Sequence, residues 1–344
     1  MFKRTVALLL VVLLMAVVFT GCQSKTETKA PNEEASKAPS FPTKKTVEIV
    51  APANPGGGWD ATARALQKVI QDNDLAPGVN VVVSNKPGGS GSIAWNMLIQ
   101  RADSHMVAMD SSYIYLNNLL GVDGAQHYTD LRPVVTLTNE WIAVYVKADS
   151  KFQTINDVLD QVKKDPSSIK VAVAPGKGND DHLSILKVAK AVDIDVKEFD
   201  KNIMATSTGE LIPGLLGGFY DVVVVGANEG AEFLKSGDLR AIAITSDERV
   251  PGDFADVPTL KEQGIDVVFP HWRGILAHPG MTDEEAAWWE DVIEKAIATD
   301  DWKKILENNS WLPFYKNSAD TMKMWEEEYK VYEQLTNEIG IKKS

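Results

Sequence analysis

Ala51-Pro52-Ala53-Asn54-Pro55-Gly56-Gly57-Gly58-Trp59-Asp60 is the stretch that decides the fold. The residues before it, 46–50, are typical of a short buried strand, and residues 61–70 carry apolar side chains at helical spacing. A strand that enters a helix through a glycine-rich turn leaves backbone N–H groups pointing outward, and the helix dipole adds positive charge there. The stretch therefore predicts an anion site made of backbone.

The N-terminus predicts export. Lys3 and Arg4 precede an apolar run over 5–18 that is too short to span a bilayer comfortably. Cys22, the only cysteine of the chain, resembles the lipobox cysteine of bacterial lipoproteins. We therefore expect residues 1–21 to be removed, Cys22 to carry lipid and the mature chain to have no disulfide. An ordinary signal peptide, or an uncleaved anchor with an incidental cysteine, is the alternative.

The composition and net charge limit the classes of molecule that the protein can bind. Residues 22–43 lack the apolar side chains of a core, so we expect the lipidated cysteine to be followed by a flexible tether. The formal net charge of −13 argues against nucleic acid or anionic lipid as a partner. No other long apolar segment follows, which excludes a channel. We expect an exported, membrane-attached monomer on the outer or periplasmic side of the cell membrane.

Strand and helix patterns alternate along the rest of the chain, which predicts an α/β fold. Two sets of similar size are joined near residue 140, and an extended stretch at 264–277 provides a second crossing. We expect a clamshell with one lobe from 44–140 plus 265–344 and another from 141–264. Strands are predicted at 47–50, 79–83, 106–109, 134–137, 142–146, 170–174, 196–199, 221–225 and 241–244. Helices are predicted at 59–73, 91–101, 113–119, 154–164, 182–192, 207–216, 228–235, 283–299, 301–308 and 318–338.

The glycine-rich turn recurs twice. The second copy contains Gly88, Gly89 and Ser90, and the third contains Pro175, Gly176, Lys177, Gly178 and Asn179. Each follows a predicted strand and opens a helix. Such turns gather at the carboxyl ends of strands in open α/β sheets, where ligands bind. A cleft with these turns from both lobes is predicted to grip a multiply charged anion.

Several side chains near these turns have two interpretations. Asp60 suits the first turn of a helix and can pair with Arg64, or it can contact ligand or water. Trp59 either lines the pocket or packs on its lobe. His182 is either a helix-start histidine or a donor to a carboxylate. Arg273 either binds a carboxylate bidentately or forms a surface or interdomain ion pair.

Hydroxyl and amide side chains at other carboxyl ends of strands are further candidates. Ser111 and Ser112 follow the strand predicted at 106–109, and Thr206 and Ser207 precede another helix. Asn228 lies at the start of the helix after 221–225. Each can cap a helix, bind ligand or do both.

Catalysis, cofactors and metals find little support in the sequence. The five histidines are scattered without zinc-ligand spacing, and no nucleotide-binding motif or nucleophile elbow is present. We therefore expect no enzyme activity, cofactor or metal. Two alternatives remain: a secreted hydrolase or transferase that uses His182 with a nearby Ser or Asp, and a sensor or partner-binding module.

A series of short motifs in order is more specific than any one turn. Residues 55–60 are followed by 63–64, 85–89, 174–178, 182–183, 215–218, 237–243, 256–260, 272–274 and 278–280. On these motifs the chain resembles the extracytoplasmic receptors of tripartite tricarboxylate transporters, the Bug receptors. The resemblance covers most of the chain, from about residue 47 to the C-terminal helices.

The resemblance implies a two-lobe, periplasmic-binding-protein-like (type II) clamshell, each lobe a mostly parallel sheet flanked by helices. It implies a small carboxylate ligand, grasped partly through water by the turns at 55–60 and 175–179, and delivery to a separate membrane permease. Trp59 stands where many members carry Thr, Arg273 lies inside the usual Trp-x-Gly, and residues 202–204 replace a more Gly-rich stretch. A bulky Trp and an added cation suit a tricarboxylate such as citrate.

Overall fold

The computed structural model describes residues 41–174 and 176–341. The predicted signal peptide, Cys22 and nearly all of the predicted tether lie outside the described residues, as does Pro175 of the third glycine-rich turn. Among the helices that are described, none has the length and apolar character needed to cross a membrane.

The first sheet has the strand order β2-β1-β3-β9-β4-β10. Strands β2, β1 and β3 are parallel to one another. The pairings of β3 with β9, β9 with β4 and β4 with β10 are antiparallel. The strands are β1 (Thr46–Ala51), β2 (Asn80–Asn85), β3 (Met106–Asp110), β4 (Arg132–Lys147), β9 (Pro270–Ala277) and β10 (Leu312–Lys316).

Helices cover this sheet on both faces. One face packs on α2 (Gly58–Asp72), α10 (Asp283–Ile297) and α11 (Asp300–Asn308). The other packs on α3 (Ser92–Arg101), α4 (Tyr113–Leu119) and α12 (Ser318–Ile339). Amphipathic stripes such as Ala63, Leu66, Val69 and Ile70 of α2 are fully buried, which is the packing that their spacing predicts.

The second sheet has the order β8-β4-β7-β5-β6. It is parallel from β7 to β5 and β6 and antiparallel at β4, and β7, four valines followed by Gly226, is buried on both faces. Its strands are β5 (Val171–Val173), β6 (Ile203–Ala205), β7 (Val222–Gly226) and β8 (Leu239–Ile244). Its helices are α5 (Ile155–Lys164), α6 (Asp180–Ala191), α7 (Val196–Asp200), α8 (Thr208–Leu216) and α9 (Ala227–Ser236).

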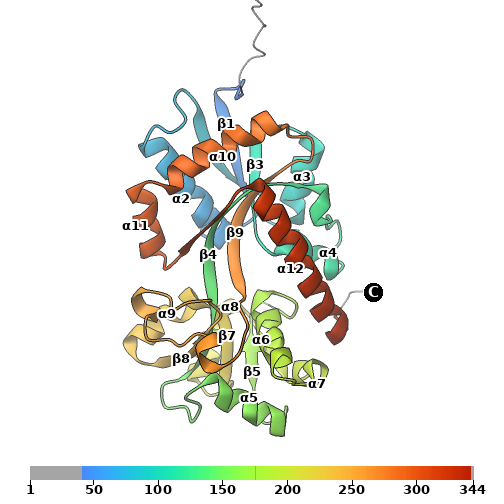
Figure 1. Cartoon of the computed structure of the whole chain (residues 1–344), viewed down its shortest axis with the longest axis vertical. Helices are drawn as coiled ribbons and strands as arrows, with labels where there is room; N and C mark the ends of the chain where they lie inside the picture. The colour runs from blue at the N-terminus through green and yellow to red at the C-terminus, as the bar shows by residue number, and fades with distance from the viewer. Residues whose placement is uncertain (1–40, 175, 342–344) are drawn as a thin grey trace, which may run out of the picture. The chain divides into compact units, whose positions relative to one another are not determined.

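One strand, β4, belongs to both sheets (Figure 1). Its first part pairs with β9 and β10, and its last part pairs with β7 and β8. The prediction of two separate strands around Thr138, Asn139 and Glu140 is wrong, because the backbone ladder with β9 continues through these polar residues. The chain crosses back after β8, where Phe269 and Thr245 exchange backbone and side-chain bonds before β9 begins.

The predicted strand at 196–199 is also wrong. Asp195 caps a short helix there by accepting N–H bonds from Lys197 and Glu198, so this segment becomes α7. The strand of this region is β6 instead, three residues after α7. Strand β10 was not predicted; Pro313 within it is tolerated because β10 lies at the edge of its sheet.

The two halves of the fold, each consisting of one sheet and the helices that pack on it, are in contact along α12. This C-terminal helix packs on β4 and α4 of the first half and on α6 and α7 of the second. One apolar cluster runs through both halves, with members such as Trp272 and Leu276 of β9 and Leu183 and Phe199 of the second half. The two halves are therefore packed against each other through α12 and a shared apolar cluster.

Candidate functional site

The first glycine-rich turn is held from beneath by Asp60. The Asp60 carboxylate accepts the Gly56 N–H at 2.8 Å, the Arg64 guanidinium at 2.9 Å and the Asn85 amide at 2.7 Å. Burial opposes ionisation of this group, but the bonds from Arg64, Gly56 and Asn85 outweigh it and lower the pKa of Asp60. Asp60 thus holds the turn in place and pairs with Arg64, which is the first of the two roles considered for it.

The start of α2 keeps donors available. Gly57 donates to Asn54 and Gly56 to Asp60, whereas the N–H groups of Gly58, Trp59 and Asp60 meet no acceptor among the described residues. These are the orphan donors of a helix N-terminus, where the macrodipole favours an anion. Free donors of this kind are what the predicted backbone anion site requires, and the binding of an anion at this turn stays a prediction.

Arg273 lies against this same helix start. A Cβ built on Gly58 would be 3.0 Å from Arg273 Nη2 and 3.5 Å from Nε, so the guanidinium lies in close contact with this glycine. The Arg273 side chain is 16% exposed and lies 3.8 Å from Glu140 Oε2. Its one hydrogen bond within the described residues is a long one to the Trp272 carbonyl, at 3.4 Å. The Arg273 guanidinium is therefore mostly buried, makes few bonds within the protein and lies next to the unpaired N–H groups at the start of α2.

Trp59 lies between the helix start and the neighbouring aromatic side chains. Its ring packs edge-on to Tyr113 at 5.9 Å and to Trp95 at 6.1 Å. The indole Nε1 is buried and has no hydrogen-bond partner in the described part of the chain. Trp59 thus packs on its own half and still offers a free donor.

The second glycine-rich turn forms a compact left-handed loop. Gly88, Gly89, Ser90 and Gly91 all have positive φ, and a Cβ on Gly88 would meet Ile93 at 2.5 Å. Asn117 of α4 fixes the loop by donating to the carbonyls of Gly89 and Ser90. The turn is exposed, and its contacts hold it to α4.

The third glycine-rich turn is fastened inside the second half by His182. Gly178 donates its N–H to His182 Nδ1 at 2.9 Å, and His182 Nε2 bonds Asp200 Oδ1 at 2.7 Å. Lys177 also pairs with Asp200, at 3.0 Å. Because both ring nitrogens of His182 are engaged within the same half, the geometry gives this fully buried histidine a positioning role.

Two further residues of this turn set how α6 begins. Asn179 caps α6 by accepting the His182 N–H at 3.1 Å, and its amide donates to the Ala174 carbonyl. Gly176 has open space beside it, and Gly178 fits under Leu120 of the first half. The turn therefore serves as part of the contact between the halves.

Asp180, directly after this turn, bonds across the two halves. Ser112 donates to Asp180 Oδ2 at 2.6 Å, and Tyr332 of α12 donates to Oδ1 at 3.1 Å. His271 Nδ1 lies 4.0 Å from Oδ2. Burial raises the pKa of Asp180 to about 6, against the two hydroxyl bonds and the charge of Arg273. Burial and the charge of Arg273 also keep the pKa of His271 well below its usual range.

The carboxyl groups of Glu140 and Glu229 lie near Arg273, and that of Asp181 lies near them. A Cβ on Gly226 would be 3.0 Å from Glu140 Oε1 and 3.6 Å from Glu229 Oε1, so both carboxyls converge on the start of α9. Asp181, which is 4% exposed, has its pKa raised well above the usual range by burial and by the charges of Glu229, Asp180 and Glu140. Glu140, Asp180, Asp181 and Glu229 are called the carboxyl cluster below.

Glu140 and Glu229 feel the same surroundings. Burial raises the pKa of Glu140, opposed by Arg273 and by the Asn228 N–H that donates at 3.4 Å. Glu229, in the first turn of α9, is exposed to solvent. Partial desolvation of its carboxyl and the nearby charge of Glu140 raise the pKa of Glu229 to about 7. Within the described residues, no group of three or more His, Cys, Asp or Glu side chains is arranged to hold a metal ion.

The remaining candidates make bonds of their own. The Thr206 and Ser207 hydroxyls both donate to the Glu210 carboxylate in the first turn of α8, and within the described residues neither caps a backbone N–H of this helix. Asn228 donates to the Asn309 carbonyl of the first half. Ser111 is buried at the end of β3, beside Ser112. The structure thus gathers Gly58, Trp59, Ser112, Asn228 and Arg273 near the contact between the halves, and leaves Thr206 and Ser207 on local bonds.

The sequence reasoning missed the carboxyl cluster and Tyr332. Asp180 and Asp181 follow the third turn directly, but two acids in a first helical turn are ordinary dipole partners. Glu140 stood in the polar break of the predicted strands, and an acid inside a strand pattern was the available signal. Tyr332 lies far along α12, and no local pattern marks it.

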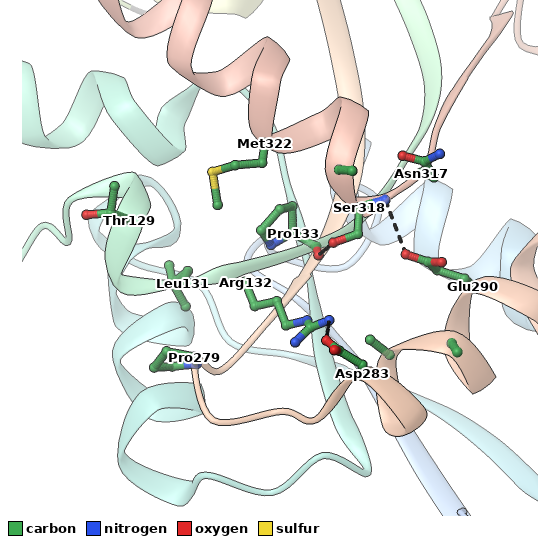
Figure 2. A pocket seen from close by; sticks show the side chains of 13 residues that line it. Thr129, Leu131, Arg132, Pro133, Pro279, Asp283, Glu290, Asn317, Ser318 and Met322 are labelled. Atoms are coloured by element: carbon green, nitrogen blue, oxygen red, sulfur yellow. Dashed lines mark hydrogen bonds and ion pairs between the residues drawn. The ribbon is translucent and has the colours of Figure 1, made fainter.

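A separate pocket of about 680 Å³ lies between the start of β4, α10 and α12 (Figure 2). Arg132 in it pairs with Asp283 at 2.7 Å and donates to the Met281 carbonyl. Ser318 donates to the Pro133 carbonyl, and its N–H donates to Glu290. Because its charged groups are largely engaged with one another, we place the candidate site at Arg273 instead.

Known proteins resemble this chain in sequence and in structure. BugT of Bordetella pertussis (strain Tohama I) is 27% identical over 243 residues, which cover 68% of this chain and 71% of that protein. The structure of MatC from Rhodopseudomonas palustris with bound malate is 20% identical with a TM-score of 0.68, and covers 86% of this chain and 99% of its own. An R. palustris protein solved with adipate is 20% identical with a TM-score of 0.71, and covers 88% and 99%.

These structures show that the chain has the periplasmic-binding-protein-like fold that its motifs implied. The family described as "Tripartite tricarboxylate transporter family receptor" (TctC) matches residues 63–341, most of the described chain. The match spans Arg64 of α2, the second and third glycine-rich turns and the β9 segment with Arg273, and it confirms the resemblance to the Bug receptors. The chain therefore belongs to the family of tripartite tricarboxylate transporter receptors.

Proposed function

We propose that this receptor captures a small carboxylate between its lobes and delivers it to the membrane permease of a tripartite tricarboxylate transporter. The observation that carries the proposal is the convergence of Arg273 on the free N–H groups of Gly58, Trp59 and Asp60. A guanidinium offers paired donors that match a carboxylate, and the helix start adds further donors. One ligand carboxylate at this point satisfies groups that the protein itself leaves without acceptors.

The relatives support the ligand class. Two proteins of the same fold were solved with malate and with adipate, which are both small dicarboxylates. The family description supports the permease as the partner that receives the ligand. We assign 44–140 plus 265–344 to one lobe and 141–264 to the other, with β4 and the stretch before β9 as the two crossings.

The mechanism is a population shift. The donors of α2 and Arg273 belong to the first lobe, whereas Asn228 and the third glycine-rich turn belong to the second. A ligand that contacts both sets favours the closed state, because only that state offers all of its contacts together. The permease then recognises a closed, loaded receptor.

We further propose that Cys22 carries the lipid that anchors the receptor to the membrane. The basic start, the apolar run and the single cysteine support this. Replacing Cys22 by Ser should release the protein from the membrane fraction and abolish the lipid mass on the N-terminal peptide. Retention of the variant in washed membranes would contradict the anchor and leave the receptor function untouched.

The carboxylate function is tested by thermal unfolding and isothermal titration calorimetry with mono-, di- and tricarboxylates. A ligand at about 100 times its dissociation constant should add about 2.7 kcal/mol to the free energy of unfolding. Arg273→Gln should weaken binding at least about tenfold, since about 1.4 kcal/mol corresponds to a factor of ten and bonds to charged groups are worth more.

Arg249→Gln is the matched control, because Arg249 is exposed and pairs with Glu262 away from the site. It should bind every carboxylate as the wild type does. Equal affinity of Arg273→Gln and the wild type for the best ligand would refute Arg273 as the carboxylate partner. A panel in which no carboxylate binds would refute the ligand class itself.

A further inference from the structure

Arg273 supplies positive charge to more than one carboxyl group. Its Nη2 lies 3.8 Å from Glu140 Oε2, so Glu140 is its ion-pair partner within the protein. Burial raises the pKa values of Asp180 and Glu229, and the same guanidinium charge opposes both rises. A ligand carboxylate bound to Arg273 would therefore take up a charge on which members of the carboxyl cluster depend.

The neighbours of Glu140 other than Arg273 do little to favour its ionised form. His271 pairs with Glu140 in the strand ladder, and burial and the charge of Arg273 keep the pKa of His271 well below its usual range. Tyr145 is neutral as well, because burial and the charge of Glu140 raise the pKa of its hydroxyl. The Asn228 N–H donates to Glu140 Oε1 at 3.4 Å, which is a long hydrogen bond. The Arg273 guanidinium is therefore the cation that opposes the effect of burial on Glu140.

Helices α6 and α9 add negative charge around Glu140. A Cβ on Gly226 would be 3.0 Å from Glu140 Oε1 and 3.6 Å from Glu229 Oε1, so these two carboxyl groups converge on one backbone position. Asp180 and Asp181 at the start of α6 belong to the same cluster, since burial and then the charges of Glu229, Asp180 and Glu140 raise the pKa of Asp181. Two carboxyl groups this close in a partly desolvated place hold a shared proton more readily than either would hold one alone.

Glu229 connects this pair to solvent. It is exposed in the first turn of α9, whereas the Glu140 side chain is only 14% exposed. A pair with one exposed member can exchange a proton with solvent while the fold stays intact. Glu140 and Glu229 therefore form a site for one proton beside the cation that is expected to bind the ligand.

We propose that this receptor takes up a proton together with its carboxylate ligand, and that Glu140 and Glu229 share this proton. The inference rests on the carboxylate-receptor function proposed above and adds the co-binding of a proton to it. The ligand carboxylate neutralises Arg273 and brings negative charge next to Glu140, so ionisation of the pair becomes less favourable. Because the loaded protein then binds more protons than the free protein, the affinity for the ligand falls as the pH rises.

The pH window of the effect follows from Glu229. Partial desolvation and the charge of Glu140 raise its pKa to about 7, so its carboxyl is mostly ionised at pH 8 in the absence of ligand. Ligand binding raises this pKa further, and proton uptake should therefore be large near pH 8. It should fade below about pH 6, where the pair already holds a proton before the ligand arrives.

Isothermal titration calorimetry of the full chain tests the linkage at pH 8 with acetate, succinate, malate, adipate and citrate. The carboxyl groups of these probes are ionised at this pH, so a proton that is taken up goes to the protein. The tightest binder is then measured in HEPES, triethanolamine and Tris, whose ionisation enthalpies differ. The observed enthalpy should vary linearly with that of the buffer, with a slope of up to about one proton taken up per ligand. The dissociation constant should rise about two- to tenfold from pH 7 to pH 8.

Two variants locate the proton. Glu140→Gln and Glu229→Gln keep the size of the side chain and remove its titratable group, and the amide oxygen of Glu140→Gln can still accept the Asn228 N–H. Each variant should reduce the proton uptake, and the double variant should abolish most of it and make the affinity nearly independent of pH. Glu232→Gln is the matched control, since Glu232 lies exposed on the same helix three residues beyond Glu229, and it should keep the wild-type uptake. Melting curves check that the variants fold.

The outcomes separate the two proposals. A slope of zero in the wild type, or a proton released on binding, would overturn the proton uptake and leave the carboxylate receptor standing. The same conclusion follows if the folded double variant takes up as many protons as the wild type, because the pair would then not hold the proton. Binding of none of the five probes would overturn the carboxylate-receptor function together with this inference. If a variant fails to fold, the wild-type slope and its pH dependence decide the question.

Discussion

We expect Asp180→Asn to stabilise the ligand-free protein at neutral pH. Asp180 is 2% exposed, and its partners are the hydroxyl groups of Ser112 and Tyr332. The groups that face it are a neutral His271 and, at longer range, Arg273. An asparagine of the same shape can accept from one hydroxyl and donate to the other, so the two bonds across the lobes survive the change.

The magnitude follows from the pKa of Asp180, which burial raises from 3.8 to about 6. Because the folded-state pKa is the higher one, the stability that this group contributes is fully present below about pH 4. It is lost as the pH rises through about 6. A shift of about two units corresponds to about 3 kcal/mol, so the wild type should lose up to about that amount relative to Asp180→Asn across this window.

The assay is differential scanning calorimetry of both proteins without ligand between pH 4 and pH 8. Other carboxyl groups also titrate in this range, so the test is the difference between the two proteins at each pH. The difference should grow from about pH 4 to about pH 6 in favour of the variant and then stay level. A difference independent of pH, or a variant that is less stable at pH 7 than at pH 4 relative to the wild type, would refute the reasoning.

Three more predictions concern other positions. Gly178→Ala places a Cβ 2.9 Å from Leu120 at a φ of +93°, and titration calorimetry should show weaker ligand binding. Gly252→Ala, at a φ of +77° with open space around it, should cost backbone strain alone, so melting curves should show lower stability and titration calorimetry unchanged binding. Asp60→Asn should lower the free energy of unfolding by about 1–3 kcal/mol in urea titrations, because it removes the charge that holds the first turn, whereas the exposed Asp72→Asn should change it by less than about 0.5 kcal/mol. Desolvation raises the pKa of Glu328 to about 8, so Glu328→Gln should match the wild type near pH 4.5 and become progressively more stable than it up to about pH 8. Equal differences in urea midpoint between the two proteins at pH 5 and pH 8 would contradict this.

Local patterns were sufficient for most of the elements. Apolar spacing placed α2, α5 and the C-terminal helices within a few residues of their bounds, because burial of one helix face is encoded by the period of the sequence. The errors occurred where tertiary or capping contacts prevail over pattern. Residues 196–199 look like a strand, yet the Asp195 cap makes them a helix, and the polar break at 138–140 lies inside a strand that two sheets share.

The candidate site was predicted in part. The Gly56–Asp60 turn and Arg273 were identified because glycine runs at strand-to-helix turns and cations near them are local signals. Their mutual contact at Gly58 joins positions more than 200 residues apart, and no spacing announces it. The same is true of the bonds from Ser112 and Tyr332 to Asp180, which join residues 68 and 152 positions apart in the sequence.

The sequence by itself determined the class of this protein: an export signal pattern, an alternation of strands and helices, and three turns that present helix starts. These features depend on neighbours along the chain, so a linear reading finds them. Only the tertiary structure decided the electrostatics around Arg273. Whether Glu140, Asp181 and Glu229 are scattered surface acids or a group facing Arg273 depends on how β4, α6 and α9 are brought together, because the interaction of charges depends on their separation in space and on the water excluded around them.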